Sequence, residues 1–179
     1  MLAASLEATQ YGDPQAPTQI MGPLISERQR QRVLNYIEIG QQEGARLVVG
    51  GRIPPHLSDK GYFVEPTLFV DVTNEMRIAR EEIFGPVIVV IPFDDDEDAI
   101  RIANDSRYGL SGAVSSASNE RALKVARRIR TGTLGINGGV FFGGDAPFGG
   151  YKESGIGREM GVAGFEEYLE MKTVALPVV

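Results

Sequence analysis

Val87-Ile88-Val89-Val90-Ile91 is a run of five β-branched apolar residues with no polar residue among them. A strand with one face in water shows alternating apolar and polar residues, whereas a continuous apolar run is typical of a strand buried on both faces of a parallel sheet. Because parallel neighbours cannot be joined by a tight turn, we expect a crossover helix to follow this strand.

The residues after this run predict two helices and two further strands. Acidic residues from Asp94 to Asp98 indicate a helix start, where negative charge meets the positive end of the helix dipole. Leu110 to Val114 is predicted to be the next strand. Apolar residues at helical spacing then predict an amphipathic helix, namely Ala122, Val125, Ala126 and Ile129. With Thr133 to Asn137 as the last strand, this β-α-β-α-β order predicts an α/β fold with a parallel sheet and right-handed crossovers.

Before the apolar run, the sequence predicts a helix and two extended segments. Ser26 and Gln29 fit a capping box, in which each side chain bonds the backbone N–H of the other, so a helix is expected from there to about Gly44. Arg46 to Val49 is predicted to be a short strand, and Tyr62 to Val72 returns to extended, β-branched character after a loop of turn residues. We expect these two extended segments either to pair as a hairpin or to form an excursion from the main sheet.

The composition limits the classes of function. A chain of 179 residues fits one domain with a substantial core. Its 18 basic and 24 acidic side chains give a net charge of −6, which argues against nucleic acid as the partner. No apolar stretch approaches the roughly 20 residues of a spanning helix, and the first residues lack the basic start of a signal peptide. We therefore expect a cytoplasmic protein that does not bind membranes.

Metal and thiol chemistry have little support. The sequence has no cysteine, which excludes disulfides, thiolate-ligated metals and an internal cysteine nucleophile. His56 is the one histidine, so neither a Ser-His-Asp triad nor a multi-histidine metal site is predicted. The acidic run from Asp94 to Asp98 lacks the alternating ligand spacing and central glycine of a calcium loop. No metal site is predicted.

A glycine-rich run from Pro147 to Glu159 carries Lys152 and Ser154 ahead of a helix predicted from about Arg158 to Tyr168. Backbone N–H groups of such a loop can cradle a phosphate at the positive end of a helix. The spacing does not fit a Walker loop, and Met160 occupies the third glycine position of a dinucleotide fingerprint. The residues alone favour an ordered loop whose glycines permit positive φ and close backbone approach, with phosphate binding as the lesser alternative.

Two phrases together resemble a known family. Glu82-Ile83-Phe84-Gly85-Pro86 and the thirteen residues from Pro147 to Glu159 resemble the carboxy-terminal part of the aldehyde dehydrogenase superfamily, the second phrase at every fixed place. Gly135 departs from the pattern, because many members carry an aromatic residue there. Further similarities follow in family order over essentially the whole chain: Gly22–Ser26, Gly61–Leu68, Asn104, Tyr108–Leu110, Gly132–Thr133, Asn137, Tyr168 and Lys172–Val174.

The resemblance implies the carboxy-terminal, catalytic-domain portion of an NAD(P)-dependent enzyme that oxidises an aldehyde to a carboxylic acid. In the family, a cysteine thiolate forms a thiohemiacetal, hydride passes to nicotinamide, and a Glu-activated water hydrolyses the thioester. The nucleophile, the general base and the Rossmann-like cofactor domain lie upstream of the position that matches Met1. We therefore expect no catalytic residue in this chain and no turnover by it alone. The alternatives are a non-catalytic assembly module and a relative that reduces acyl phosphates.

Four residues receive a role from the resemblance. In the family, the Glu of the first phrase accepts hydrogen bonds from the nicotinamide ribose and the Phe packs near the cofactor, which assigns NAD or NADP binding to Glu82 and Phe84. Phe142 and Phe148 flank a turn after a predicted strand and are expected to line the aldehyde entrance. From the residue types alone, Glu82 is expected to be a solvated carboxylate, and Phe142 and Phe148 are expected to be core residues.

The resemblance also divides the chain into residues 1–168, the catalytic-domain portion, and residues 169–179, a carboxy-terminal strand. In the family this tail is part of an oligomerisation arm that pairs with a neighbouring subunit. The expected partners are therefore a small aldehyde, the upstream part of the same enzyme and further copies of the chain. Pattern alone equally allows a private edge strand of the same sheet, since an unpaired strand edge requires a partner.

Overall fold

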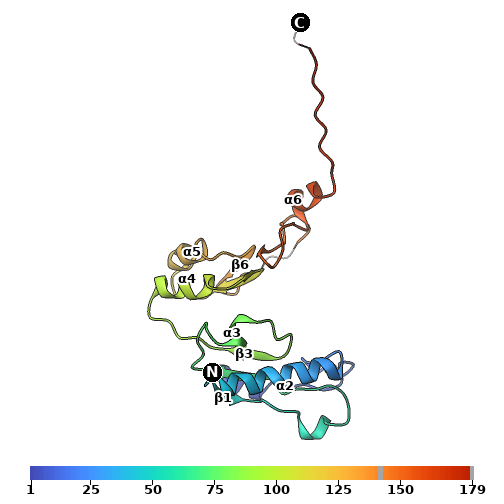
Figure 1. Cartoon of the computed structure of the whole chain (residues 1–179), viewed down its shortest axis with the longest axis vertical. Helices are drawn as coiled ribbons and strands as arrows, with labels where there is room; N and C mark the ends of the chain where they lie inside the picture. The colour runs from blue at the N-terminus through green and yellow to red at the C-terminus, as the bar shows by residue number, and fades with distance from the viewer. Residues whose placement is uncertain (141–142, 178–179) are drawn as a thin grey trace. The chain divides into compact units, whose positions relative to one another are not determined.

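The computed structural model describes residues 1–140 and 143–177. The chain divides into two compact units, Met1–Phe93 and Asp94–Val179 (Figure 1). Helices alternate with strands along the chain and two of the strand pairs are parallel, which confirms the predicted α/β class. Across the described ranges, no helix has the length and apolar character needed to cross a membrane.

The first unit is built on a three-stranded sheet in the order β1-β2-β3. β1 pairs with β2 in antiparallel orientation, so the two predicted extended segments form a hairpin-like pair, and β2 pairs with β3 in parallel. The elements of this unit are α1 (Leu2–Glu7), α2 (Glu27–Gln42), β1 (Arg46–Val49), the short 3-10 helix η1 (Pro55–Leu57), β2 (Thr67–Val70), α3 (Arg77–Arg80) and β3 (Val87–Val89).

Helix α2 begins where the sequence predicts. The Ser26 side chain accepts a hydrogen bond from the backbone N–H of Gln29 at 3.2 Å, which satisfies one of the free donors at the helix start. The buried face of α2 contributes to one apolar cluster with β2 and α3. Its buried members are Val33, Tyr36, Ile37, Ala45, Val64, Phe69, Val72, Ile78 and Ile83. This cluster is the core on which the Glu82–Gly85 loop rests.

Strand β3 is buried on one face only, which corrects the expectation of a strand covered on both. Val87, Val89 and Ile91 pack against the apolar cluster. Ile88 and Val90 point to the other side and are 41% and 38% exposed within the described chain. A continuous β-branched run thus specifies strand conformation, but which faces are covered depends on elements elsewhere in the sequence.

The second unit contains a parallel pair, β5 with β6, and a short antiparallel pair, β4 with β7. Helix α5 connects the parallel strands and buries Ala122 and Val125, as its periodicity predicts. Arg121 of α5 forms an ion pair with Asp96 of α4 at 2.6 Å, and Arg128, just after the end of α5, pairs with Glu97 of α4. The elements are α4 (Asp96–Asn104), β4 (Tyr108–Gly109), β5 (Ser111–Val114), α5 (Asn119–Ala126), β6 (Thr133–Ile136), β7 (Tyr151–Lys152) and α6 (Gly161–Glu166).

Two expectations about these elements are corrected. The apolar run at β3 pairs in parallel with β2, which the sequence did not predict as its neighbour, because strand pattern does not specify the pairing partner. The helix predicted from about Arg158 to Tyr168 is the shorter α6. The described residues 169–177 are exposed and carry no strand assignment within this single chain, so the predicted pairing of this segment with a neighbouring subunit stays a prediction.

Candidate functional site

The Glu82–Gly85 loop lies between α3 and β3 in the first unit and presents two residues to solvent. Ile83 is 8% exposed and anchors the loop in the apolar cluster. Phe84 is 70% exposed and has φ 55°, a left-handed conformation that is uncommon for a bulky residue. Glu82 is also exposed, and within the described part of the chain its carboxylate takes part in no hydrogen bond or ion pair.

Helix α2 holds this loop by its backbone. The side-chain amide of Gln29 donates to the carbonyl oxygens of Ile83 at 3.0 Å and Phe84 at 2.8 Å. Arg32 donates from Nη2 to the carbonyl oxygen of Glu82 at 2.7 Å. Three consecutive carbonyls of the loop are therefore bonded by two side chains of one helix, while the side chains of Glu82 and Phe84 are left for other contacts.

Sequence reasoning did not assign Gln29 to this loop. The predicted capping box is half formed: the backbone N–H of Gln29 donates to Ser26, but the Gln29 side chain reaches the loop carbonyls instead of the Ser26 backbone. The Gln29 amide has two N–H bonds, and the two loop carbonyls accept both of them, whereas the Ser26 backbone would provide one N–H donor to the Gln29 side-chain oxygen. The sequence signal that could have indicated this contact was a polar residue in the first turn of a helix that is predicted to pack on a core.

A charged group borders the loop on its amino-terminal side. Tyr36 donates from its hydroxyl to Glu81 Oε2 at 2.6 Å, and Arg77 donates to both carboxylate oxygens of Glu81 at 3.2 and 3.1 Å. The hydrogen bond from Arg77, and then that from Tyr36, lowers the pKa of Glu81 below its ordinary value. The hydrogen bond to Glu81 raises the pKa of Tyr36, and burial adds to that shift.

The loop therefore combines an exposed carboxylate and an exposed aromatic ring on a fixed backbone. A carboxylate offers two acceptor oxygens, which suit a pair of hydroxyl donors such as those of a ribose. An exposed ring offers a flat apolar surface to a planar ligand. Glu82 and Phe84 are thus brought together in one loop, as their shared phrase requires.

In the second unit, the glycine-rich run uses its polar side chains internally. Lys152 donates from Nζ to the carbonyl oxygens of Asn104 and Ser106, at 2.8 Å each. Ser154 accepts from the backbone N–H of Gly109 at 3.0 Å. The two side chains that would bind a phosphate are thus engaged in fixing the run to the end of α4 and to β4, which supports the ordered-loop interpretation.

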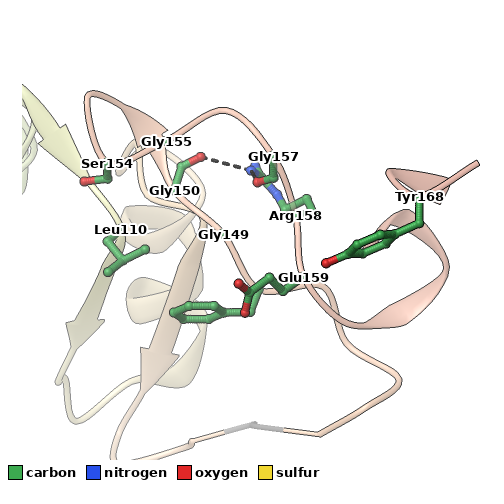
Figure 2. Close-up of a pocket in the computed structure, with 10 residues that line it drawn as sticks. Leu110, Gly149, Gly150, Ser154, Gly155, Gly157, Arg158, Glu159 and Tyr168 are labelled. Carbon is green, nitrogen blue, oxygen red and sulfur yellow. Dashed lines mark hydrogen bonds between the residues drawn. The ribbon is translucent and has the colours of Figure 1, made fainter. Parts of the chain in front are cut away.

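The same run lines a hollow of 380 Å³ that is open to solvent, shown in Figure 2. Arg158 spans the run and donates to the carbonyl oxygens of Gly150 at 3.0 Å and Gly157 at 2.8 Å. Phe148 and Glu159 exchange two backbone hydrogen bonds at 2.7 Å. The arginine therefore acts as an internal brace, and the hollow is lined mainly by residues of the glycine-rich run, together with Leu110 and Tyr168.

The predicted aromatic wall residues have different outcomes. Phe148 is half-buried and lines both the 380 Å³ hollow and a second, more apolar one of 360 Å³ beside β5 and β6. Phe142 lies outside the described residues. Within the described ranges, no group of three or more histidine, aspartate or glutamate side chains is placed to hold a metal ion.

Comparison with known proteins gives consistent matches. The model of the family described as "Aldehyde dehydrogenase family" matches residues 1–174. A betaine aldehyde dehydrogenase from Rhizobium etli (strain CIAT 652) is 51% identical over 173 residues, which is 97% of this chain and 36% of that protein. A 3-succinoylsemialdehyde-pyridine dehydrogenase from a Pseudomonas species is 52% identical over 163 residues, or 91% of this chain and 34% of that protein. The chain spans about a third of the length of these relatives.

Solved structures agree with the sequence matches. A crystal structure of Mycobacterium tuberculosis aldehyde dehydrogenase complexed with NAD⁺ superposes with a TM-score of 0.91 at 53% identity, covering 96% of this chain and 35% of that one. A betaine aldehyde dehydrogenase from Staphylococcus aureus in complex with NAD⁺ gives a TM-score of 0.89 at 42% identity, covering 93% of this chain and 33% of that one. At these identities the likeness extends beyond fold to family.

Proposed function

The chain belongs to the aldehyde dehydrogenase family, and from this we propose that it forms the carboxy-terminal, cofactor-facing part of the catalytic domain of an NAD(P)-dependent enzyme that oxidises an aldehyde to a carboxylic acid. The observation that supports this most directly is the Glu82–Gly85 loop, which presents a carboxylate and an aromatic ring on a backbone held by α2. In this proposal the chain binds and orients the cofactor and supplies no nucleophile.

The residues present fit a nicotinamide dinucleotide. The Glu82 carboxylate is exposed and has two oxygens that can accept from the two ribose hydroxyls. The Phe84 ring, two residues further along the same loop, is exposed and can pack on the nicotinamide side of the sugar. The bound cofactor would supply a hydride acceptor. Two relatives solved with NAD⁺ favour NAD over NADP as the first cofactor to test.

The thiol nucleophile has to come from polypeptide outside these 179 residues, because the sequence contains no cysteine. Phe148 contributes a wall to the aldehyde entrance in this proposal, supported by its position beside the apolar 360 Å³ hollow, and Phe142 is assigned the same role from sequence. The named substrates of the relatives make betaine aldehyde and a pyridine-substituted semialdehyde the first compounds to test.

Assembly forms the remaining part of the proposal. Residues 1–168 belong to the catalytic domain, and residues 169–179 pair as a strand with a neighbouring subunit. Support comes from the described tail residues 169–177, which are exposed, form no strand and include Met171, Val174 and Leu176 as exposed apolar side chains. An apolar segment with free backbone groups is suited to strand addition on another sheet edge.

The test is a Glu82→Gln variant of the natural full-length polypeptide that carries this chain. Glutamine keeps one acceptor oxygen but loses the charge, so the Kd for NAD should rise about tenfold, the loss expected for a charge-assisted hydrogen bond. Glu38→Gln is the matched control, because Glu38 is an exposed carboxylate on α2 that, among the described residues, accepts only from Gln42. Unchanged affinity and kinetics in Glu82→Gln would remove the assigned role. Aldehyde-dependent NAD reduction by the 179-residue chain alone would contradict the need for an outside thiol.

A further inference from the structure

We propose that Gln29 and Arg32 are positioning residues that set the conformation of the Glu82–Gly85 loop through its backbone carbonyls, and so determine where the Glu82 carboxylate and the Phe84 ring lie. This inference rests on the proposed cofactor role of the loop. It assigns a function to the first turns of α2, which lie about 50 residues before the loop in sequence.

The geometry of Gln29 is specific for this task. Its Nε2 donates to two successive carbonyls, Ile83 at 3.0 Å and Phe84 at 2.8 Å, which uses both N–H bonds of the amide. Two successive carbonyls can share one amide donor group only when the backbone between them has turned from the extended form. The two Gln29 hydrogen bonds therefore form in one conformation of the loop and stabilise that conformation.

Phe84 shows why such a contact is needed. Its φ of 55° is a left-handed conformation in which the Cβ atom crowds the following carbonyl, so a free loop would spend little time there. Glycine tolerates this conformation, but glycine would remove the aromatic ring. The carbonyl oxygen of Phe84 accepts a hydrogen bond from the Gln29 amide, and this bond offsets the free-energy cost of the left-handed conformation for phenylalanine.

Arg32 and Val33 hold the two ends of the same loop. Arg32 donates to the Glu82 carbonyl at 2.7 Å, and its guanidinium lies 5.0 Å from the centre of the Tyr36 ring, which fixes the direction of the long side chain. At the other end, a Cβ on Gly85 would overlap the side chain of the fully buried Val33. The loop is therefore fixed against α2 at three successive carbonyls and at one close backbone contact.

The experiment compares Gln29→Glu with Gln31→Glu in the natural full-length polypeptide. The Gln29→Glu carboxylate has no donor and would face two carbonyl oxygens, so it should release the loop. Gln31 lies on the exposed side of the same helix and, within the part of the chain that the structure describes, its side chain donates only to Asn35, which makes Gln31→Glu the matched control for helix propensity and charge. Arg32→Lys is a milder second variant, since lysine keeps a donor and the charge.

Hydrogen exchange of the peptide covering residues 82–87 is the first readout, and NAD affinity is the second. We expect faster exchange in this peptide alone and a Kd for NAD raised about 10- to 100-fold in Gln29→Glu, a loss typical of misplaced binding groups, with little change in Gln31→Glu and a partial effect in Arg32→Lys. Exchange that rises equally across α2 and the sheet would overturn the inference, because it would indicate general destabilisation.

Two further outcomes separate this inference from the proposed function. Weaker NAD binding with unchanged exchange of residues 82–87 would overturn the positioning role, because Gln29 would then act on the cofactor directly. Faster exchange of the loop together with unchanged NAD affinity in both Gln29→Glu and Glu82→Gln would support the backbone role of Gln29 while the cofactor role of the loop fails.

Discussion

Replacing Lys152 by methionine tests how the glycine-rich run is held in place. The substitution keeps an unbranched side chain of similar length and removes the two hydrogen bonds that Nζ donates at 2.8 Å to the carbonyls of Asn104 and Ser106. A hydrogen bond to a charged group contributes about 1.5–3 kcal/mol, and the partly buried position reduces this by screening. We expect a loss of about 2 kcal/mol in the free energy of unfolding.

Urea denaturation of the purified chain measures this loss. With a slope of about 2 kcal/mol per molar urea, the midpoint should fall by about 1 M. Lys124→Met, on the exposed surface of α5, is the matched control and should shift the midpoint far less. Lys152→Gly adds a second comparison. Lys152 has φ 54°, so the glycine variant loses the same two hydrogen bonds but is relieved of about 1 kcal/mol of backbone strain.

The reasoning is refuted if Lys152→Met and Lys124→Met unfold at the same urea concentration. A different refutation would come from inorganic phosphate: if millimolar phosphate stabilised the parent chain but not Lys152→Met, the lysine would be an anion ligand and the ordered-loop interpretation would be wrong.

Two further predictions concern the loop and its neighbours. Gly85→Ala should lower stability by about 1–3 kcal/mol because the added methyl overlaps Val33, whereas Gly144→Ala, with open space around its Cβ position, should change the Tm little. The folded-state pKa of Glu81 is lowered, chiefly by Arg77, so its contribution to stability is present above the ordinary value of 4.5 and is lost as pH falls through the lowered pKa. The stability difference between the parent chain and Glu81→Gln, measured by urea denaturation, should therefore be largest at neutral pH and shrink in acid; a constant difference would contradict the assignment.

Local patterns in the sequence predicted the elements of the fold well. Ser26 caps α2 as its residue type suggests, and the spacing of Ala122 and Val125 identifies the buried face of α5. These features depend on residues within one or two turns of each other, so the sequence contains the required information. The phrase that contains Glu82 and Phe84 likewise identified one loop, because its members are contiguous.

Contacts between distant segments were not predictable in the same way. The sequence does not show that the Gln29 amide bonds carbonyls 54 and 55 residues away, or that Lys152 bonds the end of α4. It also does not show that the Ile88 side of β3 is left uncovered in this chain. Each of these depends on which surfaces meet, and a side chain with several possible acceptors takes the ones that packing brings within reach.

The sequence by itself therefore determined the α/β class, the family, the absence of a thiol nucleophile in this chain and the presence of Glu82 and Phe84 in one short phrase. Only the tertiary structure decided that Lys152 and Ser154 serve the fold and that α2 fixes the loop carrying that pair. The physical reason is that hydrogen bonds act over about 3 Å, and the folded backbone alone determines which donors and acceptors come that close.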